Sequence, residues 1–221
     1  MKHWSYSCLF ILLALSVRSV AQETPWWELY GGFQFTGYQT VQMQKLVNSR
    51  ATSSGLLTSA IGNRANLIGW NFSTQENANS WFGGVVDFSG GYGSKRVTLS
   101  TPGKLSTVSS FKPALFTMGG GPQFSYRRND RIQPFFRMII AAAYVNLNPD
   151  ANTTSIVVGT HPAPSMNDTN LALMFGGGVD YLVKKYACFR ISGDYIHSFV
   201  FNESENSYRV SAGVSFRIGN R

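Results

Sequence analysis

The most constraining feature of this chain is a strict alternation of side chains over residues 206–218. Apolar or aromatic side chains stand at every second position from Tyr208 to Ile218, and polar or very small ones lie between them. A period of two predicts a β-strand with one apolar and one polar face. About 11 alternating residues exceed the length of most soluble strands and match what a tilted strand needs to cross a bilayer.

Similar patterns recur upstream, and together they predict eight strands. The segments are 26–37, 65–75, 81–93, 112–126, 133–146, 169–181, 186–198 and 206–218. Long connections alternate with short ones, as expected when tight turns close one end of a barrel and surface loops emerge from the other. We therefore expect an all-β fold: an eight-stranded antiparallel up-and-down transmembrane β-barrel with both termini at the short-turn end.

Charged residues fall on the polar phase of these segments. An arginine facing lipid at mid-membrane would cost about 2–4 kcal/mol, so the polar phase should face the barrel interior. Eight strands enclose a space that side chains just fill, and opposite charges there should pair. We predict an interior charge network that plugs the barrel, made of Glu28, Asp87, Arg137, Asp180, Arg190, Asp194, Arg209 and Arg217. A narrow ion path through this network is the alternative.

The N-terminus has the form of a secretory signal. A basic start at Lys2 precedes an apolar run over 8–17 and a small–x–small sequence at 19–21. The apolar run is too short for a transmembrane helix. We expect residues 1–21 to be a cleaved signal peptide and 22–221 to form the barrel domain. Cys188 would then be the only cysteine of the mature chain, which excludes an internal disulfide.

The chain is basic, with a formal net charge of +8. No basic cluster with interleaved aromatic residues accompanies this charge, so we do not expect nucleic acid as a partner. Attraction to anionic lipid headgroups explains the charge better. The polar connection over 94–111 carries lysines and arginines near its ends, and these side chains could meet lipopolysaccharide phosphates: Lys95, Arg96, Lys104 and Lys112.

The last strand carries a further pattern, a polar residue and a glycine followed by two hydrophobic residues at a spacing of two. These residues are Ser211, Gly213, Phe216 and Ile218. The pattern matches the terminal signal by which outer-membrane barrels are recognised for assembly, where a strand with one apolar row can pair by edge addition. Three further residues, 219–221, follow it here, whereas most such signals end the chain.

With its export signal, eight alternating segments and final SAGVSFRIG, the chain resembles the small outer-membrane β-barrel domain proteins, the OmpA/OmpX-like group. The segments WFGGVVDFSG at 81–90 and FGGGVDY at 175–181 are similar to recurring strands of that group. The resemblance covers about residues 26–218. It implies an outer-membrane location and an eight-stranded barrel, but it implies no ligand, because one fold serves many functions.

Some eight-stranded barrels modify lipid A, and this chain carries a histidine, a serine and two glutamates close together in sequence. His197 and Ser198 are adjacent near one strand end, and Glu203 and Glu205 follow in the next connection. Adjacent strand residues point to opposite faces, so this histidine cannot easily activate the serine. Two mature histidines and one cysteine do not suggest a metal site, and no glycine loop has phosphate-binding spacing. We expect no catalytic residues, metal or cofactor.

These observations favour a monomeric, non-enzymatic outer-membrane barrel with a structural or surface-contact role. Its expected partners are outer-membrane lipids, including lipopolysaccharide, and the barrel assembly machinery. A narrow porin-like channel and an outer-membrane lipid-modifying enzyme are the alternatives. A soluble ligand-binding barrel would need the opposite facing, with apolar side chains inside.

Overall fold

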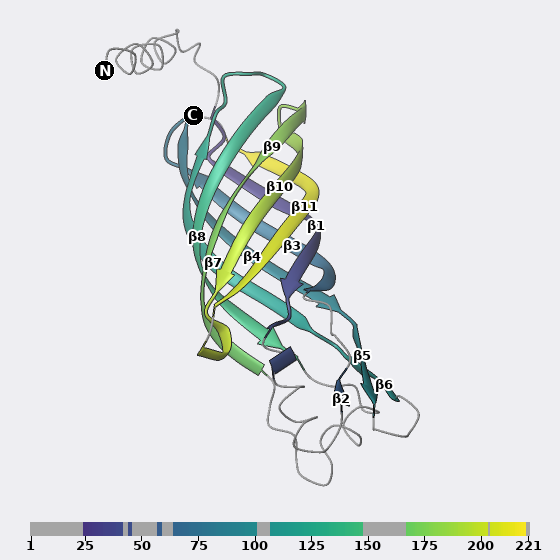
Figure 1. Ribbon diagram of the computed structural model, residues 1–221. Coiled ribbons are helices and arrows are strands. Elements are labelled where there is room, and N and C mark those ends of the chain that lie inside the picture. Colours follow the sequence, from purple (N-terminus) through teal and green to yellow (C-terminus); the bar gives the residue numbers. More distant parts are fainter. Residues whose placement is uncertain are drawn as a thin grey trace, which may run out of the picture.

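The computed structural model describes residues 24–41, 44–45, 57–58, 64–100, 107–147, 167–202 and 204–219. Eight long antiparallel strands close into a barrel (Figure 1). Their bounds are β1 Trp27–Gln39, β3 Arg64–Asn77, β4 Phe82–Gly93, β7 Ala114–Ser125, β8 Ile132–Asn146, β9 Asn167–Lys184, β10 Ala187–Ser198 and β11 Glu205–Ile218. The predicted all-β, eight-stranded barrel is confirmed, with strand ends within three residues of those expected from the sequence.

The barrel closes between its first and last strands. Trp27 of β1 lies opposite Ile218 of β11, and on its other edge β1 pairs with β3 over its whole length. The start of β1 and the end of β11 therefore share one end of the barrel with the short turns after β3, β7 and β9 (Figure 1). The predicted signal peptide, residues 1–21, lies outside the described residues.

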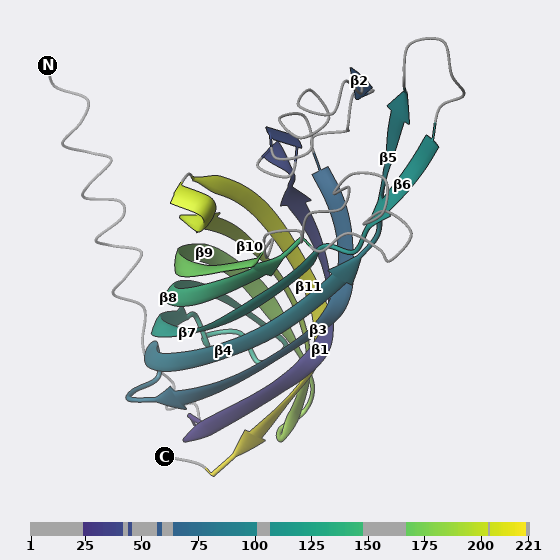
Figure 2. The same cartoon turned by 90° about the horizontal axis from the view of Figure 1, so that it is seen from below.

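A second, smaller sheet extends one side of the barrel at the opposite end. It consists of β2 (Leu57–Thr58), β5 (Lys95–Ser100) and β6 (Thr107–Phe111), paired in the order β2-β5-β6. Figure 2 shows β5 and β6 projecting beyond the rim as extensions of β4 and β7. Residues 94–111 do connect two barrel strands, as predicted, but the strands β5 and β6 within this connection were not predicted; they continue the pairing of β4 with β7 past the barrel wall. Among the described residues no helix is long and apolar enough to cross a membrane, a finding that concerns helices alone.

The outer surface of the barrel is apolar. Every barrel strand contributes large exposed hydrophobic side chains, including Phe33, Ile68, Val86, Met118, Ile140, Leu171, Ile191 and Val210. On the eight barrel strands, exposed charged side chains stand only near strand ends, at Arg64, Glu76 and Lys184. The side chains on the outer face are those that the alternating pattern predicted to face lipid. A soluble ligand-binding barrel would have the opposite arrangement, with apolar side chains inside.

Aromatic rings concentrate toward the two ends of this surface. At the short-turn end Trp81 stacks on Phe124 with ring centroids 6.1 Å apart. At the loop end Phe116 contacts Tyr92 and Tyr144 in one continuous row. Aromatic rings at both ends of an apolar belt are typical of a surface that meets both interfaces of a bilayer.

Candidate functional site

The middle of the barrel holds four fully buried charged residues in one cluster. The guanidinium of Arg137 donates two hydrogen bonds to Asp194, from Nε to Oδ1 at 2.9 Å and from Nη2 to Oδ2 at 2.8 Å. Arg209 bridges the two carboxylates, donating from Nε to Asp194 at 2.9 Å and from Nη1 to Asp87 at 2.8 Å. Asn71 donates a further bond to Asp87 at 3.0 Å. We call Asp87, Arg137, Asp194 and Arg209 the central quartet, and its formal charges cancel.

A second charged cluster lies nearer the short turns. Arg190 donates from Nε and Nη2 to both oxygens of Asp180, at 2.6 and 2.7 Å, and from Nη2 to Glu28 at 2.7 Å. Arg217 lies 3.9 Å from Glu28 and 3.6 Å from Asp180, and it donates to Gln133 at 2.8 Å. The eight charged residues named from the sequence are therefore divided between two clusters, four in each.

The sequence analysis missed one member of this second cluster, Arg127. Its Nη2 donates to Glu28 at 2.8 Å and to Asn77 at 2.7 Å, and its Nη1 donates to the carbonyl of Ser80 at 2.9 Å. Arg127 follows the end of β7, where the chain reverses and alternation no longer predicts direction. With Glu28, Asp180, Arg190 and Arg217 it forms the lower cluster, whose three guanidiniums and two carboxylates leave one positive charge.

Phe135 separates the two clusters. The Arg190 guanidinium carbon lies 4.6 Å from the centroid of its ring and that of Arg137 lies 5.9 Å from it. Guanidiniums over an aromatic face gain electrostatic attraction in addition to their ion pairs. The stacked order Arg137, Phe135, Arg190 therefore connects both clusters into one continuous interior core.

The half of the interior nearer the loops is apolar, which the sequence analysis did not predict. Its buried side chains come from seven of the eight barrel strands and from β6, and they include Leu67, Phe111, Leu115, Ile139, Ala141, Ala143, Val145, Ala172, Met174 and Ile196. The sequence of β8 does indicate this apolar region. In MIIAAAYV over 138–145, the inward and the outward positions are both apolar instead of alternating with polar residues. We call this set the upper core.

A short 3₁₀ turn, η1 (Val200–Asn202), follows β10 and packs against the upper core. Val200 is completely buried, and Phe201 adopts a left-handed conformation with φ 55° and ψ 35°. This conformation costs a non-glycine residue about 1–2 kcal/mol. The Asp168 carboxylate accepts a hydrogen bond from the Phe201 amide and so holds the turn. The connection after β10 thus reaches back over the mouth of the barrel.

Glu205 is not a loop residue, so its placement in the connection before the last strand was wrong. It is the first residue of β11 and is buried, and it accepts a hydrogen bond from the Tyr38 hydroxyl. Glu203, considered with it, lies outside the described residues.

His197 is not placed to activate Ser198, because the two side chains have different partners. The His197 Nδ1 lies 2.7 Å from Asn206 Oδ1, and its ring packs edge-on against Phe199. Ser198 points to the other face of β10 and donates to the carbonyl of Glu205 at 3.3 Å. Among the described residues no group of three His, Cys, Asp or Glu side chains is arranged to hold a metal ion.

The four residues of the predicted assembly signal divide between the faces of β11. Phe216 and Ile218 are exposed on the outer face, and Ser211 is buried inside, where it hydrogen-bonds Ser192 at 2.7 Å. A Cβ on Gly213 would lie 2.2 Å from the carbonyl oxygen of Gly31, so close approach of β1 requires glycine here. The geometry explains the glycine by barrel closure, while recognition by the assembly machinery stays a prediction.

The loop-end rim carries four cations on neighbouring segments. Three of them are exposed, whereas Lys95 stands opposite the buried Phe111 and is only partly exposed. Arg64 places its guanidinium carbon 4.4 Å from the centroid of the Tyr208 ring, and Lys95 donates to the Arg64 carbonyl at 2.6 Å. Partial burial lowers the pKa of the Lys95 ammonium. Arg96 and Lys112 are exposed on the same side of the β5–β6 extension. We call Arg64, Lys95, Arg96 and Lys112 the rim cations; Lys104, predicted with them, lies outside the described residues.

Comparisons with known proteins identify the fold. No protein-family model matches the sequence, and no curated protein matches it either. Among solved structures, the neisserial surface protein NspA is similar with a TM-score of 0.55 at 12% identity, over 89% of this chain and 99% of that one. The Yersinia pestis attachment invasion locus protein Ail, solved with a heparin analogue, gives a TM-score of 0.46 at 13% identity, over 86% and 99%. The N-terminal β-barrel domain of Pseudomonas aeruginosa OprF gives 0.41 at 10% identity, over 88% and 98%. The closed eight-stranded barrel and its similarity to NspA confirm the small-barrel fold that the resemblance implied.

Proposed function

We propose that this protein is a monomeric outer-membrane β-barrel with a filled interior and no enzymatic activity, serving as a structural or surface-contact element of the envelope. The observation that carries this proposal is the combination of an apolar outer belt with a fully packed interior. Charged side chains at mid-membrane on the outer face would oppose insertion, and the barrel strands keep their exposed charges to the ends.

The filled interior supports a plug rather than a channel. The lower cluster, the central quartet and the upper core follow one another along the barrel axis, and their side chains are almost entirely buried. An aqueous path would have to separate paired guanidiniums and carboxylates and also pass aliphatic side chains. Each separated buried pair would cost several kcal/mol.

The rim cations support contact with lipopolysaccharide. Placed at the loop end beyond the Tyr92–Phe116–Tyr144 row, they stand where the phosphates of the outer leaflet would lie. Guanidiniums and ammoniums form charge-assisted hydrogen bonds with phosphate oxygens. Loop residues beyond this rim would make the surface contact.

Fractionation combined with electrophoresis tests the location. The protein should appear in outer membranes, should migrate faster unheated than boiled, and should be lost when barrel assembly is depleted. A protein recovered from the soluble periplasmic fraction would contradict the proposal.

Planar-bilayer recording tests the plug against the porin-like alternative. The purified protein should give no steady conductance steps, whereas Arg137→Ala, which opens the central quartet, should give measurable leak. Regular steps from the unaltered protein would favour the channel. For the enzyme alternative, lipid A from cells carrying His197→Ala should be unchanged in composition; an altered lipid A would support an enzyme.

A further inference from the structure

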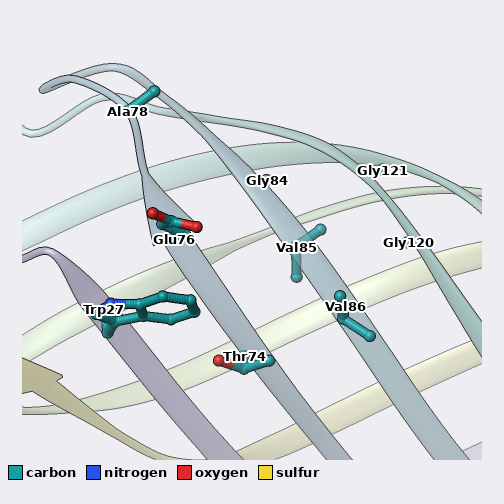
Figure 3. Close-up of a pocket in the computed structure, with 9 residues that line it drawn as sticks. All are labelled: Trp27, Thr74, Glu76, Ala78, Gly84, Val85, Val86, Gly120 and Gly121. Atoms are coloured by element: carbon teal, nitrogen blue, oxygen red, sulfur yellow. The ribbon is translucent and has the colours of Figure 1, made fainter.

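The lipid-facing surface is hollowed near the short-turn end. The hollow has a volume of about 700 Å³ and lies over β1, β3, β4 and β7. Figure 3 shows Trp27 on β1, Thr74 and Glu76 on β3 and Val86 on β4 around it, with bare ribbon at Gly84 and Gly120. This volume is in the range of small-molecule sites.

The hollow exists because outward positions that elsewhere carry large side chains carry none here. A Cβ added to Gly84 would meet no atom within 4 Å, so backbone packing does not require glycine at this position. Gly119 and Gly121, by contrast, point inward and lie against the backbone of β8. The missing side chain at Gly84 is therefore not explained by barrel closure and leaves an open space on the surface.

The strand register sets the depth of the hollow in the membrane. Trp27, Glu76 and Gly84 are cross-strand neighbours, and each stands near the short-turn end of its strand. Val86, which pairs with Gly120, lies two residues further along β4, about 7 Å along the tilted strand and so about 5 Å deeper. The hollow thus begins at the aromatic interface and continues into the hydrocarbon region, with an apolar floor and one acidic side chain at its mouth.

The acidic side chain is Glu76, which is exposed. Within the part of the chain that the structure describes, no hydrogen bond or ion pair reaches its carboxylate. It stands beside the Trp27 indole, which is 41% exposed. A carboxylate next to an aromatic face attracts ammonium groups through charge and through the ring quadrupole, and it repels lipids with a net negative headgroup.

We propose that this hollow binds a phospholipid with an ammonium headgroup from the leaflet at the short-turn end. The ammonium lies between Glu76 and Trp27, and one acyl chain lies along Gly84, Val86 and Gly120. This inference rests on the proposed membrane location.

Native mass spectrometry of the purified mature protein in detergent tests the site. Phosphatidylethanolamine and phosphatidylglycerol are added at equal concentrations, and the bound fractions are compared. The protein should retain phosphatidylethanolamine preferentially, and Glu76→Gln should lower that preference by about two- to fivefold, the size of one exposed ion pair. Gly84→Leu should abolish retention by filling the hollow, because its side chain enters open space.

Gly31→Leu is the matched control. Gly31 is also exposed on the outer face with nothing within 4 Å of an added Cβ, but it does not line the hollow. This variant should retain lipid as the unaltered protein does. Heat-modifiable migration of every variant verifies that it is folded.

Three results would overturn the inference: equal retention of both lipids, retention unchanged in Glu76→Gln, or a dimer that Gly84→Leu dissociates, which would make a second copy the occupant. Folded protein that inserts into vesicles without lipid preference refutes the site alone. Failure to insert into vesicles at all would refute the proposed function as well.

Discussion

Removing Asp194 should destabilise the barrel more than any other single carboxylate change. Its side chain accepts three guanidinium hydrogen bonds, at 2.8–2.9 Å, from Arg137 and Arg209. Hydrogen bonds to charged groups contribute about 1.5–3 kcal/mol each, but they are not additive. Breaking a buried pair from one side costs about 3–5 kcal/mol because it leaves an uncompensated charge. Asp194→Asn should therefore lower the free energy of unfolding by about 3–5 kcal/mol.

We attribute the loss of unfolding free energy to the guanidinium charge that Asp194 no longer neutralises. A second substitution tests this explanation. In Asp194→Asn the central quartet holds two guanidiniums and one carboxylate. Adding Arg209→Met restores neutrality and leaves Arg137 paired with Asp87, at 3.3 Å. The double variant should therefore be less destabilised than the sum of the two single variants, by at least about 1 kcal/mol.

Urea unfolding of protein inserted in lipid vesicles, followed by tryptophan fluorescence and gel mobility, measures these free energies. Lys184→Gln is the control, because its exposed ammonium lies at a strand end outside both charged clusters and should change stability by less than about 0.5 kcal/mol. A loss below about 1 kcal/mol in Asp194→Asn, or strict additivity in the double variant, would refute the assignment of the quartet as a closed, buried charge network.

Three further changes probe other parts of the barrel. Met174→Ala in the upper core should cost about 2–3 kcal/mol in the same urea assay through the cavity it leaves, and a neutral result would mean that this half is not packed. Phe33→Arg, at an 82% exposed position in the middle of β1, should cost about 2–4 kcal/mol in vesicles; an unchanged midpoint would mean that this face does not meet hydrocarbon. Gly213→Val should yield little heat-modifiable protein because its side chain would collide with the β1 backbone, and normal yield would contradict this closure of β1 on β11.

Much of the fold was predictable because alternation in a barrel strand is imposed by two different solvents. Lipid on one side and a crowded interior on the other leave each position one acceptable polarity. The pattern therefore located the strands and the phase of residues such as Arg137 and Asp194. The alternating pattern gives the face on which a side chain lies but not its position along the barrel axis. The pairing of Arg190 with Asp180 and Glu28 in a separate cluster therefore could not be deduced from the sequence.

The misses have local causes. Arg127 follows the last residues of β7, where the turn and not the strand period aims the side chain. The upper core was overlooked because Ala141 and Ala143 are small enough to suit either face. The β5–β6 extension continues a barrel hairpin outside the lipid region, where no apolar face is needed and the sequence reads as polar loop.

The central claim is the facing of the barrel wall, and adjacent single cysteines on β10 test it most directly. Ile191 is exposed on the outer face and Ser192 is buried inside, so Ile191→Cys and Ser192→Cys are made in a Cys188→Ser background. In vesicles, a bimane label at position 191 should be quenched by lipids with nitroxides on their acyl chains, while the thiol at 192 should resist labelling until the protein unfolds. Ready labelling at 192 with no lipid quenching at 191 would contradict the account.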